Sequence, residues 1–246
     1  MAKARPLVIG HRGAAGHAPE NTLASFRKGF DLGADCVECD FHISADKVPV
    51  IIHDETLDRT TSGKGDVRDK TAAQLRKLDA GAWFGRKFKG EKIPLLRELF
   101  QLAVARGGIV IEAKTPSSEL PETPDILAAL VKEFKSVPVM VISVDGSFLQ
   151  AFKLLCPKVH TGFLSNLLEG PEAAIETALK ASCEILSVNY RKWVEPLPRL
   201  AQDSGVKLAV WTVNSPKDIK AFLAKGISSI TSDFPDRVLL TGSDAM

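Results

Sequence analysis

The sequence predicts an α/β fold, a closed (β/α)8 TIM barrel built from a single domain that spans residues 1–246. Short apolar segments alternate with helical segments along the whole chain, which is typical of parallel strands joined by crossover helices. Eight such pairs favour a closed barrel over an open sheet, and barrels of this kind commonly have about 250 residues. Polar residues that can carry chemistry follow several strands, where barrel active sites assemble.

The eight expected strands are short and apolar, as parallel strands covered on both faces usually are. They span residues 7–11, 36–42, 109–114, 138–143, 159–163, 184–188, 207–212 and 228–232. The expected helices cover residues 22–32, 95–106, 124–134, 146–155, 171–180, 197–204, 216–225 and a short stretch after Pro235. Several of these helices begin with a proline or a capping residue and end at glycine, which supports their boundaries.

One segment interrupts this alternation. Residues 55–94 are polar and rich in glycine and lysine, and they are too many for an ordinary connection. We therefore expect a small insertion at about residues 55–94, directly after the His53–Asp54 pair, with Trp83, Phe84 and Phe88 helping to order it. An extra strand-like run precedes it at residues 48–52, and the sequence leaves open whether this run joins the barrel or pairs beside it.

The composition excludes several kinds of partner. The chain is 45% hydrophobic and 25% charged, and its net charge of +2 includes no long basic run. Nucleic acid and anionic membrane surfaces are therefore not expected partners. No apolar stretch approaches the roughly 20 residues of a transmembrane helix, and no signal segment precedes the first strand. We expect a cytoplasmic protein without stable membrane insertion, and the sequence carries no indication of its oligomeric state.

The four cysteines do not form a recognisable framework. Cys36 and Cys39 have C-x2-C spacing, but on a strand this spacing puts the two side chains on opposite faces. No second cysteine or histidine pair completes a zinc site. We therefore expect buried free thiols.

Three carboxylates stand out on the expected strands. Glu38 and Asp40 are two residues apart and so share a face of one strand, while Glu112 shares a face of another with Lys114. Acidic side chains at the ends of apolar strands are costly without a cation or a partner. Pairing with a lysine is one explanation. The other, which we favour for the set, is a divalent metal, and an all-oxygen donor set suits Mg²⁺ or Ca²⁺.

Two histidines and two cations accompany these carboxylates. His11 and His53 each follow a short apolar strand, and their near-neutral pKa suits proton transfer. Arg12 and Lys114 either compensate the carboxylates or bind an anionic phosphate group. A metal, two cations and two histidines together indicate phosphoester chemistry.

Other residues have supporting roles in this interpretation. Glu20 is expected to orient Arg12, and Asn21 and Thr22 are expected to cap the first helix. His42 shares the strand face of Asp40. Trp211 is either a packed aromatic residue or a wall for the apolar part of a substrate.

Taken in order, these motifs resemble those of the cytoplasmic bacterial type of glycerophosphodiester phosphodiesterase, and they span nearly the whole chain. They are HRG (11–13), APENT (18–22), E-x-D (38–40), PVIIHDETLDRTT (49–61), AGAWF (80–84), IEAK (111–114), WTVN (211–214) and TSDFPD (231–236). The resemblance implies a barrel with an insertion, and it implies these site residues: Glu38, Asp40 and Glu112 for a divalent ion, His11 and His53 for catalysis, Arg12 and Lys114 for phosphate.

The resemblance further implies metal-dependent hydrolysis of glycerophosphodiesters to sn-glycerol 3-phosphate and an alcohol such as choline, ethanolamine or glycerol. The nucleophile is either water or the substrate's own glycerol hydroxyl, and either histidine can act first as the base. A phosphodiesterase acting on lysophospholipids and a barrel that binds phosphodiesters without catalysis are the rival functions. We expect Arg59 and Phe84, in the insertion, to influence which alcohol is preferred.

Overall fold

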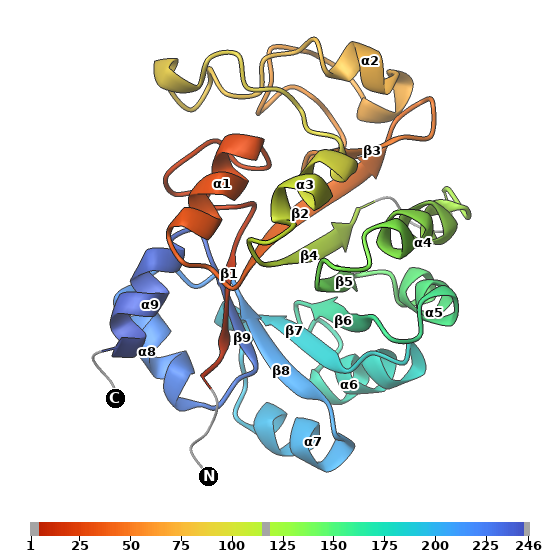
Figure 1. Cartoon of the computed structure of the whole chain (residues 1–246). Coiled ribbons are helices and arrows are strands. Elements are labelled where there is room, and N and C mark those ends of the chain that lie inside the picture. The colour runs from red at the N-terminus through yellow and green to blue at the C-terminus, as the bar shows by residue number, and fades with distance from the viewer. Residues whose placement is uncertain (1–4, 115–118, 244–246) are drawn as a thin grey trace.

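The structure, a computed structural model, describes residues 5–114 and 119–243 and has the expected closed barrel (Figure 1). β1 pairs in parallel with both β9 and β2, which closes the ring of strands. Its eight parallel strands are β1 (Leu7–Gly10), β2 (Cys36–Ile43), β4 (Gly108–Ala113), β5 (Val139–Ser143), β6 (His160–Ser165), β7 (Ile185–Asn189), β8 (Lys207–Trp211) and β9 (Ser229–Ser232). The predicted TIM barrel is confirmed.

Helices surround the strands in the expected alternation (Figure 1). Thr22 accepts a hydrogen bond from the Ser25 amide and so caps α1, as predicted, but Asn21 does not, because its side chain binds Asp40 instead. The helices that follow the barrel strands are α1 (Leu23–Asp31), α3 (Leu96–Ala103), α4 (Thr123–Glu133), α5 (Gly146–Leu155), α6 (Pro171–Lys180), α7 (Pro196–Ser204), α8 (Pro216–Ala224) and α9 (Pro235–Ser243).

The extra strand-like run lies beside the barrel. It forms β3 (Pro49–Ile51), which pairs with β2 in antiparallel orientation, so that Phe41 faces Ile51. The turn between them places Lys47 in the left-handed region, with φ of 62°.

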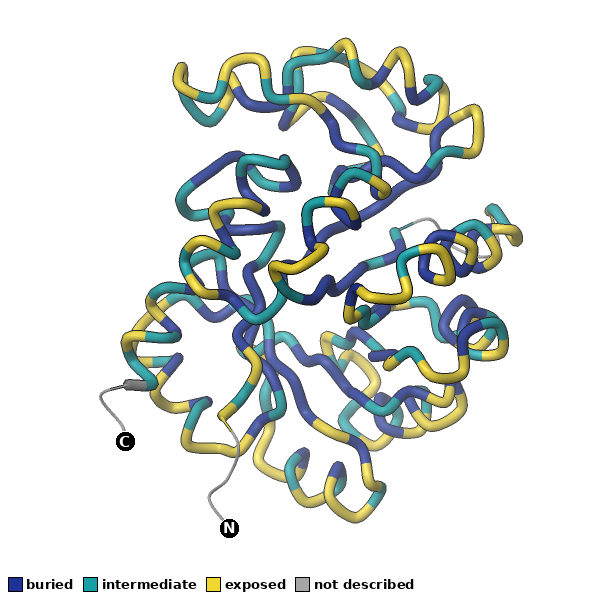
Figure 2. The backbone as a smooth tube through the Cα atoms, viewed as in Figure 1, coloured by how far each residue is buried: buried dark blue, intermediate teal, exposed yellow. Residues whose placement is uncertain are grey.

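The segment between β3 and α3 lies along the top of Figure 1 and contains only short helices: η1 (Val67–Asp69), α2 (Ala72–Leu75) and η2 (Arg86–Phe88). It buries an apolar cluster of its own, with Leu57, Val67, Leu75 and Ile93 at the centre. The aromatic residues lie outside this cluster and contact one another edge to face, Trp83 with Phe84 and Phe84 with Phe88, and Trp83 is 44% exposed. The rest of the molecule has its buried residues between strands and helices (Figure 2).

Two sequence expectations, on the cysteines and on membrane-spanning helices, can be compared with the structure. All four cysteines are free, with Cys36 partly accessible and the other three buried. Within residues 5–114 and 119–243, the structure contains no helix long and apolar enough to cross a bilayer.

Candidate active site

Three carboxylates meet on the neighbouring strands β2 and β4, with Glu38 and Asp40 inside β2 and Glu112 next to the end of β4. The parallel register sets Asp40 beside Glu112, and Glu38 precedes Asp40 by two residues on the same face. One oxygen from each of the three side chains lies within 4.8 Å of the other two. Glu38 and Asp40 are buried, with 3% and 1% of their surfaces exposed. Strand periodicity therefore explains how residues far apart in sequence form one compact acidic cluster.

The cluster is electrostatically unfavourable without a cation. Burial raises the pKa of Glu38 well above its usual value, and the charges of Asp40 and Glu112 raise it further. Burial and the charge of Asp40 raise the pKa of Glu112 to about 7. Asp40 differs: burial opposes its ionisation, but Lys114 and Arg12 hold its pKa well below the usual range. An all-oxygen set that is short of positive charge fits a hard divalent cation.

Arg12 and Lys114 contact this cluster from two sides. The Arg12 backbone amide donates to Glu38 Oε2 at 2.8 Å, and its Nε lies 3.3 Å from Asp40 Oδ2 without the alignment of a hydrogen bond. Lys114 Nζ lies 3.1 Å from Asp40 Oδ1 and also donates to Glu112. Both cations compensate carboxylates, as one of the two sequence interpretations requires.

The loop that carries Arg12 is held in an unusual conformation. Arg12 and Gly13 have φ angles of 48° and 93°, and a Cβ atom on Gly13 would lie 2.4 Å from the Ser25 carbonyl carbon. The Ser25 hydroxyl donates to the Arg12 carbonyl at 2.7 Å and accepts from the Ala14 amide at 2.9 Å. Only glycine suits the position after Arg12, and this explains the glycine of the HRG motif.

Asn21 holds the central carboxylate. Its Nδ2 donates to Asp40 Oδ2 at 2.8 Å, and its Oδ1 accepts from the Asp40 amide at 3.2 Å. Asn21 adopts φ of 58°, a region in which asparagine is better tolerated than most residues. The residue predicted to cap a helix is therefore a support for the acidic cluster.

Each of the two histidines has an aspartate on its Nδ1 atom. His11 Nδ1 lies 2.6 Å from Asp233 Oδ1, and His53 Nδ1 lies 2.7 Å from Asp54 Oδ1. A carboxylate at Nδ1 favours the hydrogen on that nitrogen and leaves Nε2 for proton exchange. Asn214 holds Asp233 in turn, with its Nδ2 2.6 Å from Asp233 Oδ2.

Arg59 connects the aspartate beside His53 with the glutamate beside Arg12. Its guanidinium donates to both oxygens of Asp54, at 2.7 and 2.9 Å, and to both oxygens of Glu20, at 2.9 and 2.8 Å. Glu20 also accepts from Arg12 at 2.6 Å, which is the contact expected between these two residues. The Arg59 hydrogen bonds, followed by the His53 bond, hold the pKa of Asp54 well below its usual range.

Sequence reasoning missed Asp233, Asn214 and Asp54 as functional candidates, and it gave Arg59 only a role in the choice of alcohol. All four stand inside motifs already recognised, TSDFPD, WTVN and HDETLDRTT, and this position is the signal that could have identified them.

The remaining polar candidates have different positions. His42 Nε2 lies 3.1 Å from the His53 carbonyl oxygen and so donates to it. The ring of Trp211 packs against the small apolar cluster of Ile9 and its neighbours inside the barrel, and its Nε1 donates to the Ser187 carbonyl. It remains only partly buried.

The chain is similar to known proteins. Residues 11–237 match the Glycerophosphoryl diester phosphodiesterase family. The chain is 35% identical over 237 residues to the glycerophosphodiester phosphodiesterase of Caldanaerobacter subterraneus subsp. tengcongensis, a match that covers 96% of this chain and 97% of that one. It is 32% identical to the glycerophosphodiester phosphodiesterase of Bacillus altitudinis, with 94% and 96% covered.

Solved structures agree with these matches. An Oleispira antarctica phosphodiesterase in complex with the product sn-glycerol-3-phosphate superimposes with a TM-score of 0.90 and 29% identity, covering 97% of each chain. The glycerophosphodiester phosphodiesterase of Thermotoga maritima gives a TM-score of 0.77 at 26% identity, covering 98% of this chain and 99% of that one.

Proposed function

Because the chain belongs to the glycerophosphoryl diester phosphodiesterase family and is an enzyme of that activity, we propose that its hydrolysis of glycerophosphodiesters depends on a divalent cation. Glu38, Asp40 and Glu112 would hold Mg²⁺ or Ca²⁺. The products would be sn-glycerol 3-phosphate and an alcohol. The compact set of three carboxylate oxygens within 4.8 Å of one another, on the neighbouring barrel strands β2 and β4, carries this proposal. The cytoplasmic location stays a prediction.

The chain's own residues divide the chemistry as follows. A bound cation would stabilise negative charge on the phosphoryl oxygens. Arg12 and Lys114 would donate to those oxygens. Of His11 and His53, one would take a proton through Nε2 from the nucleophile, and the other would give a proton to the departing alcohol oxygen. Asp233 and Asp54 would keep the two rings in the tautomer that allows this exchange.

Two further features complete the proposal. Trp211 would form part of the wall beside the glycerol group, and Glu20 would orient Arg12. The nucleophile would be water or the glycerol hydroxyl of the substrate. Attack by the glycerol hydroxyl would form a cyclic phosphate and attack by water would not, and phosphorus NMR of the reaction mixture would detect that intermediate.

The experiment is a comparison of turnover in histidine variants with Mg²⁺ or Ca²⁺ supplied, measured as release of sn-glycerol 3-phosphate. We expect His11→Ala and His53→Ala each to lower kcat by about 10² to 10⁴. The double variant should lose far less than the product of the single losses, because the two rings work in one reaction. His160→Ala is the matched control, since His160 is exposed at the start of β6. Strictly multiplicative losses would contradict a shared role.

A further inference from the structure

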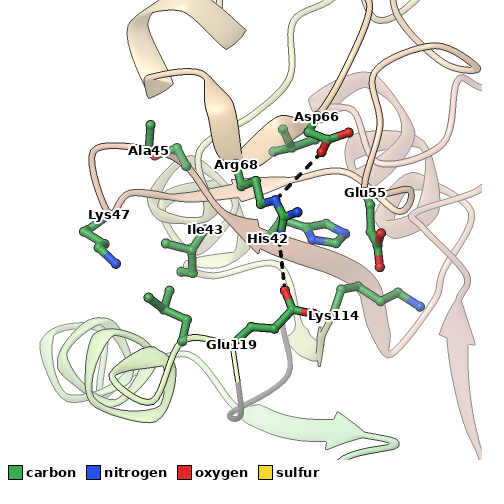
Figure 3. A pocket seen from close by; sticks show the side chains of 12 residues that line it. His42, Ile43, Ala45, Lys47, Glu55, Asp66, Arg68, Lys114 and Glu119 are labelled. Atoms are coloured by element: carbon green, nitrogen blue, oxygen red, sulfur yellow. Dashed lines mark hydrogen bonds and ion pairs between the residues drawn. The ribbon is translucent and has the colours of Figure 1, made fainter.

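A polar cavity of about 270 Å³ lies beside the acidic cluster. Figure 3 shows His42, Glu55 and Lys114 at one end of it and Lys47 at the other. Four of its lining residues are buried, namely His42, Ile43, Ser44 and Val67. None of Glu38, Asp40, Glu112, His11 and His53 lines it, so it adjoins the reaction site and is not the site itself.

Two contacts and one short stretch of chain connect this cavity to the acidic cluster and to His53. Lys114 lines the cavity and also contacts Asp40 and Glu112. His42 lines it and donates to the His53 carbonyl at 3.1 Å. Glu55 lies two residues after His53 in the chain. A group attached to a phosphate held by Lys114 could therefore extend into the cavity without leaving the site.

Most charges that line the cavity already have partners. Arg68 lies 3.3 Å from Glu119 and 3.8 Å from Asp66, and Figure 3 shows it between the two. Lys47 pairs with Glu122 at 2.8 Å. Glu55 differs, because in residues 5–114 and 119–243 no basic side chain forms an ion pair with its carboxylate. Glu55 is thus a lining carboxylate without an ion pair, whereas Asp66 and Glu119 share the single cation Arg68.

The lining also restricts which cation would fit. Quaternary ammonium groups are usually recognised by the faces of several aromatic rings. In the described part of the chain, the lining contains no phenylalanine, tyrosine or tryptophan. A primary ammonium group, by contrast, needs charged or neutral oxygen acceptors, which Glu55 supplies. Glycerol, which is neutral, would gain nothing from the charge.

We propose that this cavity binds the alcohol part of the substrate and that Glu55 selects a primary ammonium group there, so that the ethanolamine diester is preferred over the choline and glycerol diesters. This inference rests on the proposed function, because it needs the phosphate to lie against Lys114. It makes Glu55 a specificity residue that takes no part in bond cleavage.

The test compares kcat/KM for glycerophosphoethanolamine, glycerophosphocholine and glycerophosphoglycerol in the wild-type enzyme and in Glu55→Gln. We expect the wild type to favour the ethanolamine diester and Glu55→Gln to lower its kcat/KM by about three- to fivefold, the upper range for an ion pair to an exposed carboxylate such as Glu55. The glycerol diester should change by less than about twofold, because it carries no charge for Glu55 to attract. Asp69→Asn is the control, since Asp69 is an exposed carboxylate of the same insertion that does not line the cavity.

The outcomes separate this inference from the function itself. Hydrolysis of all three diesters without an ethanolamine preference, or equal proportional losses in Glu55→Gln, would overturn the role of the cavity and leave the hydrolytic function in place. Failure to hydrolyse any of the three with Mg²⁺ or Ca²⁺ supplied would overturn both.

Discussion

The two histidines of the site are held by aspartates with different support. Asp233 is fixed by a neutral amide, that of Asn214, whereas Asp54 is fixed by the guanidinium of Arg59. The aspartate beside His53 therefore has a cationic hydrogen-bond partner, whereas the partner of the aspartate beside His11 is neutral. This asymmetry offers a way to distinguish the two rings in solution.

The His53 ring should titrate below its ordinary value of about 6.5. Burial lowers its pKa most, and this outweighs the opposing effects of Asp40 and of the Asp54 hydrogen bond. Replacing Asp54 with Asn removes a contact that favours the protonated ring, so the midpoint should fall further. NMR titration of the ring protons in metal-free protein measures this, with Asp58→Asn as a control for loss of an acidic charge in the insertion. A midpoint that rises in Asp54→Asn would contradict the assignment.

Arg59 should act as a positioning residue. Its donors bind Asp54 and Glu20, so the contacts favour this role over the choice of alcohol expected from the sequence. Arg59→Ala should lower kcat about tenfold for every diester, as the loss of a charged, multiply bonded contact typically does, because it releases both His53 and Arg12. Arg59→Lys should recover only part of this, since lysine lacks the forked donor geometry.

The control for this comparison is Arg86→Ala, another arginine of the insertion, which should keep nearly full activity. A changed ranking of the choline, ethanolamine and glycerol diesters in Arg59→Ala would favour the original specificity interpretation.

At the scale of elements, the loop after β1 is the most constrained part of the site. Gly13→Ala combines a strained φ of 93° with a contact of 2.4 Å to the backbone of Ser25. It should lower the free energy of unfolding by at least about 2 kcal/mol. Gly205→Ala also places a side chain at positive φ, but in open space, and should cost about 1 kcal/mol. Urea denaturation measures both, and equal losses would show that the close approach to Ser25 is unimportant.

The elements differed in how well the sequence predicted them. Strands and helices of the barrel were predictable because their apolar periodicity and their caps are local signals. The sequence leaves the pairing of β3 with β2 open, because an antiparallel strand outside the ring has the same apolar pattern as one inside it. The sequence predicts that Asn21 helps to cap α1, and only the fold reveals that its side chain reaches Asp40.

At the scale of the whole molecule, the barrel explains why the strand-borne part of the site was predictable. Parallel strands end at the same face, so Glu38, Asp40 and Glu112 follow from the topology once the strands are placed. The supporting residues were not predictable in this way. Arg59 contacts Glu20, 39 positions away in the sequence, and His11 contacts Asp233, 222 positions away. These residues lie in loops, and the apolar periodicity of the sequence does not predict the conformation of a loop.

The central claim is that the acidic cluster holds a divalent cation required for turnover. The most direct measurement follows sn-glycerol 3-phosphate release by the purified enzyme after exhaustive chelation, then after titration with Mg²⁺ or Ca²⁺, beside Glu112→Gln. We expect chelation to abolish turnover and one of these ions to restore it. Glu112→Gln should remain inactive at the ion concentration that restores the wild type, since it lacks one charged ligand. Full turnover in the chelated wild type, or in Glu112→Gln, would contradict the account.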